Sequence, residues 1–434
     1  MRIVFLSIVF YIATCRAAVP FLHSWPPSAV QSDQHVLAAD TASLVSESFR
    51  HARGFVSLGD SYSAGIGTGL DGDYLASEGD CRRGQHGYPL LLHLDLNNVT
   101  KSNTSMQWLS CTGARTKDIL SGTPLSQVDL LNISLPLDFA TLSVGGNDLG
   151  FFDVMNACIF RFYSFYSGTC EAALAASDAA IASDLFEQRL EIILQEILDK
   201  VVWEKRPRFT ITVTGYARFF NDITPECDDM SLGVWYGGPK LSQYIRTRMN
   251  ELVVATNAKL QRTVDIVNAR FSGDRPKVLF VNYDTLFEGH RFCEPGVMEP
   301  AYDRVESWFF LVGGPDNARN KTMWPNGTNG DPEESRYQNH RQAQTILAPG
   351  SELVDPDRCL AHAQKTGDWG QLALCYMAMA KSRDPSLRPA YRGVVPMNGM
   401  WWVPTYYGKT FHPRSLGCEG IRDRIYEAWD EYGL

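Results

Sequence analysis

The chain has 434 residues, a formal net charge of −9 and a pI near 5.5. This acidic balance argues against nucleic acid as a partner, because binding to phosphates requires clustered Lys and Arg. The hydrophobic fraction of 44% is ordinary for a globular chain with a real core, and the length alone would allow two or three domains.

The first predicted element is a secretory signal peptide, residues 1–17. Arg2 gives it a positive start, an apolar run follows from Ile3, and residues 15–17 (CRA) resemble a small-residue cleavage site. The run is shorter than the roughly 20 apolar residues that a membrane span requires, and no later segment is a better candidate. We therefore expect a secreted, extracellular protein without stable membrane insertion.

Five N-glycosylation sequons agree with export. Asn is followed two residues later by Ser or Thr at Asn98, Asn103, Asn132, Asn320 and Asn326. One such match means little, but five behind a signal peptide predict a glycoprotein whose sequons lie at the surface.

After residue 50, short apolar or β-branched runs alternate with helical patterns. The predicted strands are 54–58, 106–110, 139–144, 209–214 and 278–283. One helical pattern aligns Phe186, Leu190, Ile193, Ile197 and Val201. A second aligns Ile245, Met249, Leu252, Leu260, Val264, Val267 and Phe271. Strands separated by helices predict an α/β domain, residues 50–434, with a parallel sheet covered on both faces.

This alternation fails in the segment of about 295–400. The segment is rich in Pro, Gly, Asn and Asp and contains the stretch CLAHAQKTGDWGQLALC. A structureless loop of that length is improbable inside a compact domain, so we predict an insertion or small subdomain. The chain would return to the core near Phe411, and a helix over 418–429 would complete the cover of the sheet.

Loss of the signal peptide removes Cys15 and leaves nine of the ten cysteines, so at least one thiol stays unpaired. Pairing of sequence neighbours would join Cys81 with Cys111, Cys158 with Cys170, Cys227 with Cys293 and Cys359 with Cys375, leaving Cys418. Eight cysteines allow many other connectivities, which the sequence does not distinguish. Neither C-x-x-C nor H-E-x-x-H occurs, so we expect no metal and no cofactor.

The stretch FVSLGDSYSAGIGTG, residues 55–69, suggests two competing kinds of site, one that binds a dinucleotide and one with a nucleophilic serine. Residues 67–72 formally match the dinucleotide pattern G-x-G-x-x-G, but the strand ends too early for them to bind a pyrophosphate. Ser61 follows the strand directly, at the carboxyl edge where open α/β sheets bind ligands. A helix beginning after Ser61 would direct free N–H groups to the same place. The alternative role for this serine is an ordinary helix N-cap.

Four sequence blocks resemble the GDSL (SGNH) hydrolase superfamily. They are GDSYSAG with Ser61, SCTGART with Gly113, LSVGGNDLGF with Asn147 and KTFHP with His412, in that order over roughly 350 residues. The resemblance implies a flavodoxin-like three-layer α/β/α sandwich with a parallel sheet of about five strands. It implies Ser61 as nucleophile and His412 as general base and acid. The N–H groups of Ser61 and Gly113 and the amide of Asn147 would form the oxyanion hole.

The sequence CRRGQHGYP and the six cysteines from Cys81 to Cys293 further resemble the secreted bacterial and fungal esterase branch, which has three disulfides. The insertion is outside the resemblance. One departure concerns the triad acid, which family members usually carry three residues before the histidine. That position is Lys409, which cannot accept a hydrogen bond and would disfavour the imidazolium if it pointed inward.

Some members of that branch use a main-chain carbonyl in place of the acid, which implies a Ser–His dyad. We expect this carbonyl to come from MNGMWWVPTYY, residues 397–407. Asp60 and Asp148 are less suitable, because each is expected to stabilise its own turn.

The sequence thus predicts a secreted serine esterase or lipase that acts through an acyl-enzyme. Small esters, lipids and acylated carbohydrates all fit, and a carbohydrate deacetylase on the same fold is one alternative. A non-catalytic secreted binding protein on a hydrolase scaffold is another, supported only by Lys409. The aromatic stretches ESWFFLV and NGMWWVPTYY would line an acyl pocket or a lid over Ser61. The sequence does not indicate an oligomeric state.

Overall fold

The structure is a computed structural model. It describes residues 51–69, 81–122, 126–160, 169–232, 239–273, 275–301, 304–312, 314–318 and 408–433. The predicted features that lie outside these ranges are the 1–17 signal peptide, Asn320, Asn326, Cys359, Cys375, the 397–407 stretch and most of the 295–400 insertion.

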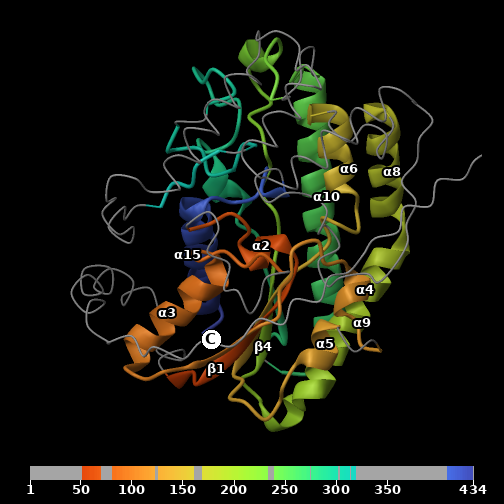
Figure 1. Ribbon diagram of the computed structural model, residues 1–434. Coiled ribbons are helices and arrows are strands. Elements are labelled where there is room, and N and C mark those ends of the chain that lie inside the picture. Colours follow the sequence, from red (N-terminus) through yellow and green to blue (C-terminus); the bar gives the residue numbers. More distant parts are fainter. Residues whose placement is uncertain are drawn as a thin grey trace, which may run out of the picture.

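Five parallel strands form the centre of the fold (Figure 1). They are β1 (Gly54–Gly59), β2 (Ser105–Trp108), β3 (Phe139–Ser143), β4 (Thr210–Thr214) and β5 (Val278–Val281). Their order in the sheet is β2-β1-β3-β4-β5, the flavodoxin-like order. All five predicted strands are confirmed, with ends that shift by at most two residues. Residues of β1, β3 and β4 are buried on both sides of the sheet, which is why these strands read as continuous apolar and β-branched runs.

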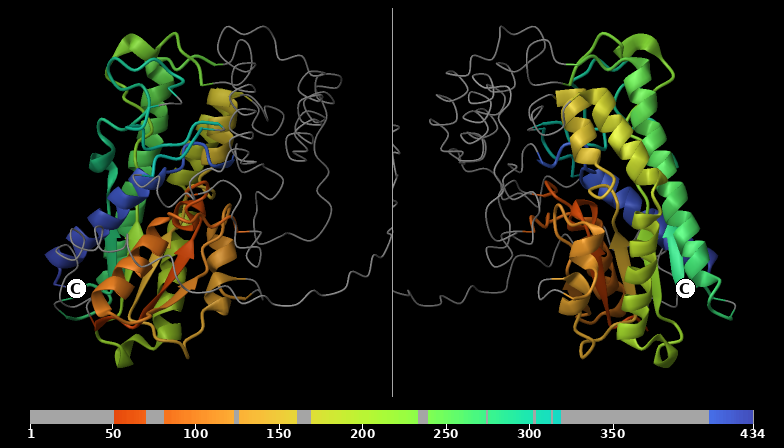
Figure 2. Two further views of the ribbon diagram at one scale, coloured as in Figure 1. Left: turned by 60° about the vertical axis from the view of Figure 1, so that its left-hand side comes forward. Right: turned by 90° about the vertical axis from the view of Figure 1, so that its right-hand side faces the viewer.

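Helices cover both faces of the sheet (Figures 1 and 2). On one face α3 (Tyr88–Thr100) packs against α15 (Ser415–Glu431), and on the other α9 (Asp184–Val201) packs against α10 (Gln243–Asn268). The remaining α-helices are α2 (Ser61–Ala64), α4 (Thr116–Ile119), α5 (Gln127–Leu130), α6 (Phe151–Met155) and α8 (Cys170–Ala182). A π-helical turn, η2 (Asn156–Phe160), and three 3₁₀ turns, η3 (Trp203–Lys205), η4 (Pro225–Cys227) and η5 (Asp284–Phe287), complete the described elements. The three-layer α/β/α architecture is as predicted.

The two helical patterns are α9 and α10, and the predicted closing helix is α15. All five aligned side chains of α9 are buried, as expected for a face against the sheet. In the second pattern Phe271 lies beyond the end of α10, where the helix has given way to a turn. The sequence did not reveal α3 and α8, because neither carries a strongly one-sided apolar stripe.

The beginning of the predicted insertion packs into the core. Within ESWFFLV, Phe309 and Phe310 are buried, and Phe309 forms an antiparallel bridge with Pro413. This stretch therefore supports the segment around His412 and is not an exposed lid. The boundaries of the domain and of the insertion stay predictions.

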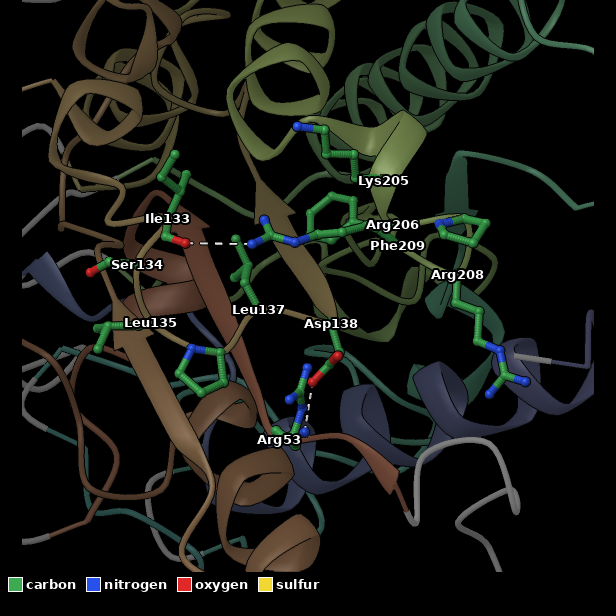
Figure 3. A pocket seen from close by; sticks show the side chains of 12 residues that line it. Arg53, Ile133, Ser134, Leu135, Leu137, Asp138, Lys205, Arg206, Arg208 and Phe209 are labelled. Atoms are coloured by element: carbon green, nitrogen blue, oxygen red, sulfur yellow. Dashed lines mark hydrogen bonds between the residues drawn. The ribbon is translucent and has the colours of Figure 1, made fainter.

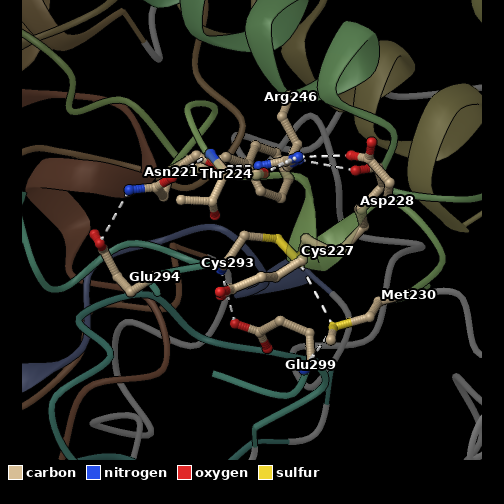
Figure 4. The surroundings of a disulfide bond; sticks show 12 residues. Asn221, Thr224, Cys227, Asp228, Met230, Arg246, Cys293, Glu294 and Glu299 are labelled. Atoms are coloured by element: carbon tan, nitrogen blue, oxygen red, sulfur yellow. Dashed lines mark hydrogen bonds and ion pairs between the residues drawn. A yellow bond between two sulfur atoms is a disulfide. The ribbon is translucent and has the colours of Figure 1, made fainter. Parts of the chain in front are cut away.

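Three disulfides are present among the described residues: Cys81–Cys111, Cys158–Cys170 and Cys227–Cys293. They agree with pairing of sequence neighbours, and Cys418 is a buried free thiol. The third disulfide joins the loop after β4 to the loop after β5 (Figure 4).

Beside this disulfide, the guanidinium of Arg246 is fully buried. It donates hydrogen bonds to the carbonyls of Leu241, Asn221 and Thr224 and to the carboxylate of Asp228. A disulfide and a buried cation thus fix the same loop above the carboxyl edge of the sheet.

Candidate active site

Ser61 is the first residue of α2 and lies two residues past the end of β1. The turn before it depends on Gly59, whose φ is +123°. A Cβ at this glycine would lie 2.1 Å from the Ser143 carbonyl oxygen, so no other residue fits. Asp60 then caps the short helix by accepting the N–H of Tyr62 at 3.0 Å. The N-cap is therefore Asp60, which leaves the Ser61 hydroxyl available for other contacts.

The imidazole of His412 meets this hydroxyl. Its Nε2 lies 2.6 Å from the Oγ of Ser61, and its Nδ1 lies 3.1 Å from the carbonyl oxygen of Thr410. Since a carbonyl only accepts, Nδ1 carries the proton and donates to Thr410. Nε2 is then the acceptor and takes the hydrogen bond from Ser61.

Burial keeps this imidazole neutral. Removal from water lowers the pKa of His412 from 6.5 to about 4, against the opposing effect of hydrogen bonds to the main chain of Thr410 and Lys409. At neutral pH the ring is therefore in the state that can accept a proton.

Two N–H groups near Ser61 have no acceptor among the described residues. They are the main-chain N–H groups of Ser61 and Gly113. Gly113 has a φ of +82° and follows Cys111, whose N–H bonds the Gly59 carbonyl, so its loop is fixed to the turn before Ser61. The amide of Asn147 is half-buried and donates one hydrogen bond to the Ala114 carbonyl at 3.0 Å, which orients the group. These donors belong to loops that meet at the carboxyl edge of β1, β2 and β3.

No family model matches the chain. Lipase 1 of Streptomyces coelicolor is 31% identical to it over 242 residues, which are 56% of this chain and 74% of that protein. The chain belongs to the GDSL (SGNH) hydrolase superfamily. A lipase of Streptomyces rimosus is 29% identical over 242 residues, again 56% of this chain and 74% of the relative. Because both relatives are lipases, this chain, called the hydrolase below, is an enzyme that acts on esters.

Two solved structures are similar to the hydrolase. The extracellular lipase of Streptomyces rimosus has 26% sequence identity and a TM-score of 0.42, and the match covers 57% of this chain and 90% of that one. Phospholipase A1 of Streptomyces albidoflavus has 27% identity and a TM-score of 0.41, and the match covers 56% of this chain and 84% of that one.

A buried hydrogen-bond network holds the turn that carries Ser61. The carboxylate of Asp60 accepts hydrogen bonds from the Tyr216 hydroxyl at 2.6 Å and from the Ser143 hydroxyl at 2.9 Å. The Tyr216 hydroxyl in turn accepts the N–H of Gly146 at 3.0 Å. Burial raises the pKa of Asp60 to about 6, although these hydrogen bonds oppose the shift. Tyr216 thereby connects the loop of Ser61 with the loop of Asn147.

Sequence reasoning missed Tyr216. The available signal was its place two residues after β4, at the same edge of the sheet as Ser61. The prediction for Asp148 was wrong in part, because its carboxylate bonds the first residue of α4 instead of its own turn. It accepts from the N–H and the hydroxyl of Thr116, at 2.9 and 2.6 Å.

The group that orients His412 is also different from the expected one. The acceptor is Thr410, two residues before the histidine, whereas the stretch 397–407 lies outside the described residues. Lys409 is buried, and its Nζ lies 4.6 Å from the centroid of the Phe310 ring. Electrostatic repulsion by this lysine is not among the causes that lower the pKa of His412, which is lowered by burial.

A cavity of about 500 Å³ lies at the other edge of the sheet (Figure 3). Its wall includes Arg53, Asp138 and Phe209, the residues that immediately precede β1, β3 and β4. The length of β1 separates it from Ser61, roughly 20 Å at the usual rise per residue. This cavity is therefore not part of the site.

The described residues contain neither a membrane span nor a metal-binding cluster. None of the helices there has the length and apolar character to span a membrane. In the same ranges, no cluster of three His, Cys, Asp or Glu side chains is arranged to bind a metal ion.

Proposed function

We propose that this chain is a secreted carboxylic ester hydrolase that works through an acyl-enzyme on Ser61. The observation that carries the proposal is the 2.6 Å contact between Ser61 Oγ and Nε2 of a neutral His412. A serine hydroxyl is a weak nucleophile unless a base removes its proton, and this geometry supplies the base.

The reaction follows from these two groups. Nε2 of His412 takes the hydroxyl proton while Oγ of Ser61 bonds to the ester carbonyl carbon, and the carbonyl π electrons move to its oxygen. When the tetrahedral intermediate collapses, the bond to the alkoxy oxygen breaks and that oxygen receives the proton from Nε2. Water then repeats the sequence on the acyl-enzyme and releases the carboxylic acid.

The oxyanion would be held by N–H donors in the loops that follow β1, β2 and β3 at the carboxyl edge of the sheet. The N–H groups of Ser61 and Gly113 and the side-chain amide of Asn147 fit this role. Loss of one such donor typically costs about 3–4 kcal/mol of transition-state stabilisation.

In this proposal His412 acts in a dyad. When its ring becomes an imidazolium, Nδ1–H stays bonded to the Thr410 carbonyl, which supplies the orientation that an acid supplies in a triad. A carbonyl dipole stabilises the cation less than a carboxylate, so the dyad relies on close placement of the ring.

We propose esters with an aliphatic acyl chain, including lipid esters, as the substrate class. The two Streptomyces relatives named lipase support this class. Carbohydrate deacetylation and non-catalytic binding are the alternatives that the experiment below separates from it.

The test is hydrolysis of p-nitrophenyl esters from acetate to laurate, with acetylated xylan as a second substrate. The wild type and the exposed control Ser102→Ala should hydrolyse the esters, whereas Ser61→Ala and His412→Ala should lose on the order of 10³-fold or more in kcat. A fluorophosphonate should add covalently to Ser61, located by peptide mass mapping. Equal activity of the wild type and Ser61→Ala would overturn the proposal, and activity on acetylated xylan alone would favour the deacetylase.

A further inference from the structure

The segment that carries His412 is bound to residues 304–312 and 314–317, which together we call the clamp segment. The N–H of Phe310 bonds the His412 carbonyl at 3.0 Å, and the N–H of Phe411 bonds the Phe310 carbonyl at 2.9 Å. The N–H of Arg414 bonds the Trp308 carbonyl at 2.7 Å. The main chain on both sides of the histidine is therefore held by a segment that the sequence assigned to an insertion.

Two side chains of the clamp segment cap the helix that follows His412. Helix α15 begins at Ser415, and its own N-cap residue, Arg414, makes no side-chain cap. Instead Asp316 Oδ1 accepts the N–H of Ser415 at 2.8 Å, and Asn317 Oδ1 accepts the N–H of Leu416 at 3.0 Å. Residues about 100 positions away in sequence thus satisfy donors that a local Ser, Thr or Asp usually satisfies.

Asp316 also reaches the loop of the nucleophile. Its Oδ2 accepts the N–H of Gly69 at 2.8 Å and the hydroxyl of Ser415. Gly69 lies in the same glycine-rich stretch as Ser61, just beyond α2. One carboxylate therefore binds the start of α15 and the Ser61 loop at the same time.

The clamp is itself fixed. Asn317 is buried, and its amide donates to the carbonyls of Val305 and Ser307 at 2.8 and 3.1 Å. The buried guanidinium of Arg414 donates to the carbonyls of Arg304 and Ser307 at 2.7 and 2.9 Å. The bonds of Asn317 lie within the clamp segment, and those of Arg414 join the His412 segment to it.

The turn before the histidine requires such support. Phe411 has a φ of 64°, in the left-handed region that a bulky residue adopts only when its surroundings hold it there. The acceptor for Nδ1 is a main-chain carbonyl, so the orientation of the imidazole follows the main chain of 409–413 directly. A shift of this turn would move the Thr410 carbonyl and the ring together.

We propose that Asp316, supported by Asn317, is the positioning residue that holds His412 against Ser61. It acts through the main chain and replaces, by another route, the side-chain acid whose usual position is occupied by Lys409. The inference rests on the proposed function, because it concerns the geometry of the same dyad.

Asp316→Asn alters both contacts of Oδ2, and Ser415→Ala removes one of the two. In Asp316→Asn the remaining oxygen still accepts the N–H of Ser415, but an amide NH₂ replaces the oxygen that accepts from Gly69, so two donors face each other. Ser415→Ala removes only the hydroxyl contact with Asp316. It is the milder variant and provides the test if Asp316→Asn does not fold. The matched control is Asp95→Asn, since Asp95 is also buried and also binds α15, through Tyr426 and Arg422 far from the histidine.

The first readout is kinetic. We expect Asp316→Asn to lower kcat on the order of 10- to 100-fold with KM within about twofold, because misplacement of a base by about 1 Å costs that much. Ser415→Ala should lower kcat by about threefold to tenfold, since it removes one of these contacts. Asp95→Asn should keep kcat within about twofold of the wild type, even if its melting temperature falls as much as that of Asp316→Asn.

The second readout does not depend on activity. In protein labelled with ¹⁵N-histidine, the His412 Nδ1–H signal, assigned by its loss in His412→Ala, should be present in the wild type and in Asp95→Asn. It should be broadened or lost in Asp316→Asn. An unchanged kcat and Nδ1–H signal in both Asp316→Asn and Ser415→Ala would overturn the inference, as would equal losses of kcat in Asp316→Asn and Asp95→Asn. An inactive wild type with the predicted change in the Nδ1–H signal would instead refute the proposed function and leave the clamp standing.

Discussion

At the scale of single residues, the proposed chemistry depends on a histidine that burial keeps uncharged. The pKa of His412 falls to about 4 because the ring is removed from water, and only hydrogen bonds to the main chain oppose this effect. In the proposed mechanism the neutral ring is the active form, since only it can accept the proton of Ser61.

This sets the pH dependence of the reaction. We expect kcat/KM to be low below pH 4, to rise as the pH passes through about 4, and to stay level from pH 6 to pH 8. The measurement is kcat/KM for a p-nitrophenyl ester with a buffer series corrected for the uncatalysed rate. A midpoint near 6.5, the ordinary value, would show that the ring is solvated in the free enzyme.

Tyr216 is the second residue whose role can be tested alone. Tyr216→Phe removes one of the hydrogen bonds to the buried Asp60 carboxylate and the acceptor of the buried Gly146 N–H. It should lower the free energy of unfolding by about 1–3 kcal/mol. Burial raises the pKa of Asp60 to about 6 in the folded state, so below pH 6 the buried carboxyl is mostly protonated and neutral. As the pH rises through 6 the carboxyl ionises, and the free energy needed to bury its charge then lowers the stability of the fold. The loss in Tyr216→Phe should therefore be larger at pH 8 than at pH 5.

Urea unfolding at these two pH values measures the difference. The exposed Tyr244 provides the control, since Tyr244→Phe should change stability by less than about 0.5 kcal/mol at either pH. A loss that is the same at both pH values would mean that Tyr216 stabilises the fold without acting on the charge of Asp60.

At the scale of elements, the strands and the long helices were predictable because burial imposes a pattern on them. Strands buried on two faces read as short apolar runs, and α9 and α10 each expose one side, so their apolar residues recur every three or four positions. Helix α8 was not predictable in this way. Its small alanines are compatible with helix at every position but give the sequence no dominant face.

The disulfides act on the loops between these elements. Cys227–Cys293 spans 66 residues and fixes the loops after β4 and β5, whereas Cys158–Cys170 spans only 12. Removal of a cross-link over a longer loop releases more chain entropy in the unfolded state, roughly 4 against 3 kcal/mol for these two loops.

We therefore expect Cys227→Ala with Cys293→Ala to lower the free energy of unfolding more than Cys158→Ala with Cys170→Ala. The difference should be about 1–1.5 kcal/mol in guanidinium unfolding. The reverse order would show that interactions of the folded state, such as the hydrogen bonds around Arg246, outweigh chain entropy at these sites.

At the scale of the whole molecule, parallel strands bring distant residues to one edge. Ser61, Gly113 and Asn147 each follow a strand of the sheet, so their convergence could be predicted from the sequence once the strands were placed. His412 follows no strand, and the sequence located it only through the family resemblance. The reason is that hydrogen bonds with the clamp segment, and not the sheet, determine its place.

The reaction could take place at the carboxyl edge or at the amino edge of the sheet, and one substitution at each edge distinguishes the two. Asn147 lies at the carboxyl edge, where Asn147→Ala should lower kcat on the order of 10²-fold if the residue is the oxyanion donor proposed above. Arg208 is exposed beside the cavity at the amino edge, roughly 20 Å away, where Arg208→Ala should leave kcat/KM within about twofold of the wild type. The rates of both variants are compared at equal folded fraction, determined by circular dichroism. A loss of rate then cannot come from unfolding of the variant. A loss in Arg208→Ala as large as that in Asn147→Ala would place the reaction, or an element coupled to it, at the wrong end of β1 for the dyad of Ser61 and His412.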